Sequence, residues 1–107
     1  MNVVNATTKQ KPVYSEFNSD PDFEELLEMF VEAIPEKKTI LSDSYESAEY
    51  DEIKRQAHQL KGAGGGYGFD GLTDLAAELE SACKANDIDR VGQTLDTLLG
   101  YMDRIAV

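Results

Sequence analysis

The chain has 107 residues, which is enough for one small domain with a modest core. Its formal net charge of −11 makes the chain as a whole repel phosphate backbones, which argues against nucleic-acid binding. The single cysteine excludes an internal disulfide, and no apolar run reaches the length of a membrane span. These features predict a cytoplasmic protein that binds neither nucleic acid nor membrane.

The first 18 residues differ in pattern from the rest of the chain. Residues 1–18 carry few apolar positions at any regular period, and we expect a loosely ordered N-terminal segment in which Val13, Tyr14 and Phe17 dock onto the domain. Residues 19–107 contain no internal repeat and no low-complexity linker, so we expect them to form a single domain. The sequence indicates no role for the N-terminal segment.

The first predicted helix begins near residue 20. Asp20 or Ser19 can cap it, with Pro21 at the first helical position. Its apolar residues recur every three or four positions and predict one buried face, made of Phe23, Leu26, Leu27, Phe30, Val31 and Ile34. Pro35 either kinks this helix or starts a second one, and residues 36–47 continue the helical pattern.

Three further segments have helical periodicity. They span residues 49–65, 70–86 and 86–107, and Asp87 is the expected N-cap of the last one. Their expected buried residues are Ile53, Ala57, Leu60 and Gly64, then Leu72, Leu75, Ala76, Leu79 and Cys83, then Ile88, Val91, Leu95, Leu98, Leu99, Met102 and Ile105. No segment shows the two-residue alternation of a strand. The fold class is therefore predicted to be all-α, with short connections that favour antiparallel neighbours in a bundle.

Charge is distributed unevenly along the chain. Residues 53–68 carry three bases, Lys54, Arg55 and Lys61, and no acid, whereas the segments on either side are rich in acids. All three bases lie three or four positions from His58, the only histidine, and helical residues at that spacing are neighbours. The sequence therefore predicts a basic surface around one histidine in an otherwise acidic protein.

His58 is expected on the polar side of its helix, because the apolar stripe points elsewhere. An exposed imidazole can act as a nucleophile near neutral pH. Lys61, one turn ahead, can reach back to neutralise an anion held on the ring. Gly62 removes the side chain that would lean over the ring, since helical side chains tilt toward the N-terminus, and Gly65 extends the bare surface. Phosphoryl groups are the anions that such a site suits.

The glycine run after His58 does not match a phosphate-binding loop. Counting from Gly62, both the P-loop pattern and the dinucleotide pattern require glycine where the chain has Tyr67. Both motifs also follow a strand, and this run follows a predicted helix. One histidine and one cysteine cannot supply a zinc site either. Gly64 falls on the inward stripe and predicts close helix packing, Gly68 predicts the turn out of the helix, and Gly66 has no assigned role.

The segment AHQLKGAGGGYGF, residues 57–69, resembles the signature of histidine-containing phosphotransfer (HPt) domains. In that signature lysine follows the histidine by three positions and glycine by four and by ten, as Lys61, Gly62 and Gly68 follow His58 here. The helical pattern on both sides is also similar, over roughly residues 20 to 105. The chain departs from the family in having three consecutive glycines, 64–66, where serine and alanine are more often mixed in.

The resemblance implies an up-down-up-down antiparallel four-helix bundle, here with a short extra N-terminal helical segment. It implies a phosphocarrier without kinase activity, in which His58 accepts a phosphoryl group from a receiver aspartate and passes it to another. Lys61 would steady that group and Gly62 would keep the ring open. No cofactor is expected, and Mg²⁺ would belong to the receiver partner. We expect a monomer whose receiver-binding face includes Lys54, Arg55, Gln59 and Gly65.

Two alternatives stay open at this point. The chain can be an inert helical module that binds an acidic partner through the basic face around His58. It can also be the dimerisation and phosphoacceptor part of a histidine kinase, although that region normally accompanies an ATP-binding domain, for which the chain has neither the length nor the glycine motifs. The sequence does not identify the donor receiver, the acceptor receiver or the pathway.

Overall fold

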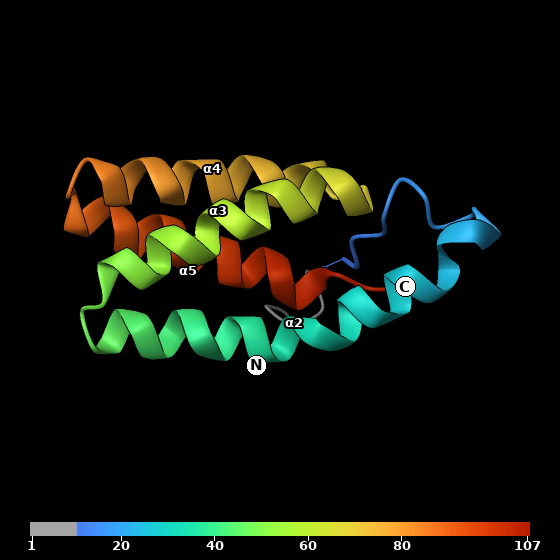
Figure 1. Cartoon of the computed structure of the whole chain (residues 1–107), viewed down its shortest axis with the longest axis horizontal. Helices are drawn as coiled ribbons and strands as arrows, with labels where there is room; N and C mark the ends of the chain where they lie inside the picture. Colours follow the sequence, from blue (N-terminus) through green and yellow to red (C-terminus); the bar gives the residue numbers. More distant parts are fainter. Residues whose placement is uncertain (1–10) are drawn as a thin grey trace, which may run out of the picture.

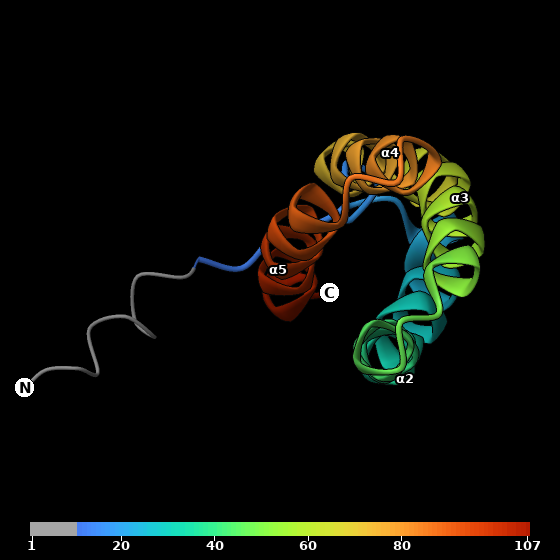
Figure 2. The same ribbon diagram turned by 90° about the vertical axis from the view of Figure 1, so that its left-hand side faces the viewer.

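The structure is a computed structural model that describes residues 11–107. In this part of the chain, a 3₁₀ turn, η1 (Pro21–Phe23), leads into four helices: α2 (Glu24–Glu46), α3 (Tyr50–Tyr67), α4 (Asp70–Lys84) and α5 (Ile88–Arg104). Consecutive helices run in opposite directions (Figure 1), and seen end-on they follow one another in chain order around an arc (Figure 2). The predicted all-α, antiparallel four-helix bundle is confirmed.

The beginning of the first helix follows its capping residues. The Asp20 carboxylate accepts a hydrogen bond of 2.9 Å from the backbone N–H of Asp22, and Pro21 occupies the first position of η1. Helix α2 then continues through Pro35 without a break, so no second helix starts there. Asp87 caps α5 by accepting from the backbone N–H of Arg90 at 3.2 Å, as predicted.

The exit from α3 explains the glycine at position 68. Gly68 has φ +83°, the left-handed conformation that side chains disfavour. A Cβ there would also lie 2.5 Å from Ser15 Oγ and 2.9 Å from the Phe17 ring. The backbone therefore turns from α3 into α4 at a position that only glycine fits, as the sequence predicted.

The core lies between the inward faces of all four helices. Its largest fully buried side chains are Phe69, Leu41, Ile53, Leu72, Leu79, Leu98, Met102 and Val91. Leu26, expected on the buried face of α2, is 48% exposed, and Ile88, expected on that of α5, is 40% exposed. Each helical residue is rotated about 100° from the next, so a face centred on Leu27, Phe30 and Ile34 leaves Leu26 at its margin.

Residues 11–18 lie across one end of the bundle. The backbone N–H of Val13 donates to Arg104 O at 2.7 Å, and that of Glu16 donates to Gly68 O at 2.9 Å. Val13 and Phe17 pack against the core, whereas Tyr14 is 50% exposed. Residues 1–10 of the predicted N-terminal segment lie outside the described residues, and the expected boundary at residue 18 stays a prediction.

Candidate functional site

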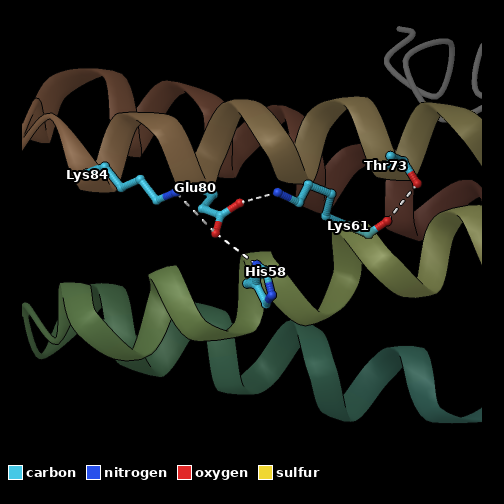
Figure 3. Close-up of polar contacts among 5 residues, drawn as sticks. All are labelled: His58, Lys61, Thr73, Glu80 and Lys84. Atoms are coloured by element: carbon cyan, nitrogen blue, oxygen red, sulfur yellow. Dashed lines mark hydrogen bonds and ion pairs between the residues drawn. The ribbon is translucent and has the colours of Figure 1, made fainter.

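His58 projects from the middle of α3 on the side that faces α4. Its side chain is 68% exposed, while its helical neighbours Ala57 and Leu60 are buried at 0% and 2% exposure. The apolar stripe thus fixes the rotation of α3, and that rotation presents the imidazole to solvent, as the sequence predicted. Figure 3 shows the ring beside the polar side chains that approach from α4.

Glu80 makes the polar contact to His58, and the sequence pattern did not predict it. Its side chain is only 8% exposed. Glu80 Oε2 lies 3.0 Å from His58 Nδ1, and Oε1 accepts a hydrogen bond of 2.8 Å from Lys61 Nζ. Lys84 Nζ lies 3.7 Å from Oε2, one helical turn farther along α4. Glu80 therefore joins the histidine and lysine of the motif to the neighbouring helix.

The surroundings of Glu80 keep it ionised. The hydrogen bond from Lys61 is the largest cause that lowers the pKa of Glu80 from 4.5 to about 2, and it outweighs the burial that opposes it. The hydrogen bond from His58 and the charge of Lys84 act in the same direction. An ionised carboxylate can only accept hydrogen bonds, so His58 Nδ1 must be the donor. The neutral ring then carries its free lone pair on Nε2.

Close packing between α3 and α4 allows Glu80 to reach the histidine. A Cβ on Gly64 would lie 2.8 Å from the backbone nitrogen of Thr73 and 2.9 Å from Phe69 O, so no other residue fits without moving the backbone. The Thr73 hydroxyl donates to Lys61 O at 2.9 Å, which ties the two helices together beside this glycine. The predicted close packing at Gly64 is confirmed.

The other helical glycines of the run open the surface instead. A Cβ on Gly62 or on Gly66 would meet no atom within 4 Å, and one on Gly65 would meet only Thr73 Oγ1 at 3.9 Å. All three are exposed. The surface beside His58 therefore has no side chain at Gly62, one turn from the ring, which leaves space for a partner to approach.

A family model described as the Hpt domain matches residues 25–107. The chain belongs to the Hpt domain family. Hpt domains are phosphocarriers of two-component signalling, and they interact with the receiver domains of response regulators. A search of curated proteins found no match to the chain, and neither did a search of solved structures.

The positive charge around the histidine of this Hpt domain is smaller than the sequence suggested. Arg55 forms two hydrogen bonds with Glu52, of 3.1 and 2.5 Å, and Lys61 is paired with Glu80. Glu52 and Glu80 lie outside residues 53–68, so a count of the charges within that segment does not include them. Arg55 and Gln59 are exposed, while Lys54 is half-buried.

The rest of this Hpt domain offers few features for other chemistry. Across residues 11–107, no group of three or more histidine, cysteine or acidic side chains is placed to hold a metal ion. No helix within that range is long and apolar enough to cross a membrane. Cys83 is buried, and this burial raises the pKa of its thiol. The polar cluster around His58 is therefore the candidate site.

Proposed function

We propose that the chain is a phosphorelay carrier in which His58 accepts a phosphoryl group from a receiver aspartyl phosphate and passes it to a second receiver aspartate. The contact of 3.0 Å between His58 Nδ1 and Glu80, on a ring that is otherwise exposed, carries this proposal. Membership of the Hpt family supports the same role. The chain has no kinase activity of its own in this proposal.

The transfer step follows from the ring nitrogen that remains free. His58 Nε2 attacks the phosphorus in line, the new N–P bond forms, and the bond from phosphorus to the aspartate oxygen breaks. The electrons of that bond leave with the receiver carboxylate, and the Nδ1 proton stays on the ring. The ring therefore becomes an imidazolium, whose positive charge faces the ionised Glu80. The reverse reaction delivers the group to the second receiver.

Other residues assist by position and charge. Lys61 lies one turn from His58 and would steady the phosphoryl group, and Gly62 leaves the approach to the ring open. The receiver-binding face would include Lys54, Arg55, Gln59 and Gly65 around the histidine. The receiver would supply Mg²⁺, and the chain would need no cofactor. A monomeric state and a cytoplasmic location also stay predictions.

The test is transfer from receiver domains encoded in the same genome, phosphorylated at aspartate with a small phosphodonor and Mg²⁺. The wild-type chain should gain an acid-labile, base-stable label from at least one receiver, and His58→Gln should gain none. Gln93→Ala changes an exposed polar residue on α5 and should behave as wild type. An acid-labile label that survives in His58→Gln, or a wild-type chain that no receiver labels, would contradict the proposal. The inert-module alternative predicts the second of these results.

A further inference from the structure

Glu80 has two lysines beside it, although one would be enough to hold it in place to orient the histidine. Lys61 and His58 reach its two oxygens from α3, at 2.8 and 3.0 Å, and Lys84 approaches from its own helix at 3.7 Å. Figure 3 shows the Glu80 carboxylate between the two lysines. The closer lysine comes from the motif, and the more distant one has no role in the function proposed above.

Lys61 has two tasks that compete. In this structure its ammonium is bonded to Glu80, which lies on the Nδ1 side of the ring. A phosphoryl group would be attached to Nε2, so Lys61 must weaken or give up its bond to Glu80 to contact that group. Glu80 would then lose the closest of its lysines while its side chain is only 8% exposed. Only the charged ring would then lie at hydrogen-bond distance from this carboxylate, and a buried carboxylate whose charge is incompletely compensated tends to take up a proton.

A protonated Glu80 would be neutral and would no longer balance the positive charge of the phosphorylated ring. A neutral carboxyl group can still accept a hydrogen bond from Nδ1–H, but it does not compensate the positive charge that the ring carries after the transfer. Loss of the carboxylate charge would therefore weaken the phosphorylated state that the carrier has to hold. A second cation beside the charged ring is therefore needed in place of Lys61 if Lys61 turns to the phosphoryl group.

The geometry points to Lys84 as the replacement partner that holds Glu80 ionised when His58 is phosphorylated. Its side chain is 64% exposed, so rotation of its flexible stem can shorten the present separation of 3.7 Å between Lys84 Nζ and Glu80 Oε2 to a hydrogen bond. Glu80 and Lys84 are four residues apart with the acid first, which is the favourable order for a helical pair. The inference rests on the proposed function, because it assumes a phosphoryl group on His58 Nε2.

Exchange between the two lysines can be tested first without phosphate. The signal of His58 Nδ1–H in ¹H–¹⁵N spectra reports the bond to Glu80. Lys61→Met should keep this signal because Lys84 takes over, and Lys84→Met should keep it because Lys61 remains. The double variant should lose it. If the double variant kept the Nδ1–H signal, the exchange would be contradicted. Loss of the signal in Lys84→Met alone would also contradict it, because Lys84 would then have a merely structural role.

The second test compares the phosphorylated proteins. Phosphoramidate, a small-molecule donor for exposed histidines, loads each variant, and phosphoryl exchange with a receiver domain is then followed to equilibrium. Lys84→Met should lose the Nδ1–H signal only when phosphorylated, and its share of phosphohistidine at equilibrium should fall about three- to tenfold, as expected for a partly buried ion pair. Lys84→Arg should restore both. Lys37→Met makes the same charge change on α2 and should match wild type.

The outcomes separate the two proposals. A wild-type chain that is never labelled on His58 would overturn the proposed function, and this inference with it. A labelled wild-type chain together with a Lys84→Met variant of unchanged signal and equilibrium would overturn the inference alone. A loss of the same size in Lys37→Met would also overturn it, because the effect would then come from net charge rather than from the contact with Glu80.

Discussion

Glycines on the two sides of α3 have opposite structural roles. Toward α4, Gly64 lets the backbones approach so closely that a Cβ would lie 2.8 Å from Thr73 N. On the outer side, two positions away, a Cβ on Gly62 would meet nothing within 4 Å. One glycine permits the packing that carries Glu80 to the histidine, and the other leaves the ring accessible. A glycine-rich helix can therefore be closely packed on one side and bare on the other.

Gly64→Val should have the largest effect on stability. The added side chain must displace backbone atoms of α4, and overpacking of this kind should lower the free energy of unfolding by about 3 kcal/mol. Urea unfolding followed by circular dichroism measures this change. A loss below about 0.5 kcal/mol, the level of an ordinary surface substitution, would show that the helices are not in close contact at Gly64.

Thr73→Val should have a smaller effect on the same side. It keeps the shape of the side chain but removes the hydrogen bond of 2.9 Å to Lys61 O, and the free energy of unfolding should fall by about 1 kcal/mol. Thr97→Val is a matched control, because the Thr97 hydroxyl bonds to Gln93 O within its own helix and is exposed. A larger loss in the control than in Thr73→Val would contradict a role for Thr73 in joining α3 to α4.

Gly62→Ala should act in the opposite direction on stability. Alanine is the better helix former and has open space at this position, so the free energy of unfolding should rise by about 0.5–1 kcal/mol. The initial rate of transfer from a phosphorylated receiver should fall, because the new methyl group lies beside the ring. Gly66→Ala is the control, with equally open space one turn farther on. A destabilised Gly62→Ala, or a lower transfer rate in Gly66→Ala alone, would contradict this interpretation of the bare side.

The response to acid tests the Glu80 cluster. The pKa of Glu80 is lowered in the folded protein from 4.5 to about 2, so its contribution to stability is complete above about pH 4.5 and disappears as the pH falls toward 2. The difference in unfolding free energy between wild type and Glu80→Gln should therefore shrink over this window. Urea titrations at several pH values measure it, and a difference that grows with acid would contradict the assignment.

Much of the fold was predictable because local patterns determine it. The three- and four-residue periodicity predicted the helices, Asp20 and Asp87 indicated where helical structure begins, and Gly68 indicated the exit from α3. The same periodicity placed His58 on the exposed side, because the buried stripe of α3 leaves only one polar face. Leu26 was placed wrongly because periodicity defines a face to within about one residue, which is about 100° of rotation.

Glu80 could not be found in the same way. It lies 22 residues from His58, and its contact depends on how α4 is rotated and how closely it approaches α3. One signal was present in the sequence: Glu80 shares a face with Ala76 and Cys83, four positions before it and three after it, and both are buried. A charged residue in an apolar stripe needs a partner, and only the packed structure shows that the partners are His58 and Lys61.

The most direct test of the central claim is the position of phosphorus on the ring. NMR of the phosphorylated chain with ¹⁵N-labelled histidine distinguishes the two ring nitrogens by their coupling to phosphorus. Because Glu80 holds Nδ1–H, the phosphoryl group should be attached to His58 Nε2. Attachment to Nδ1, or to any residue other than His58, would contradict the account.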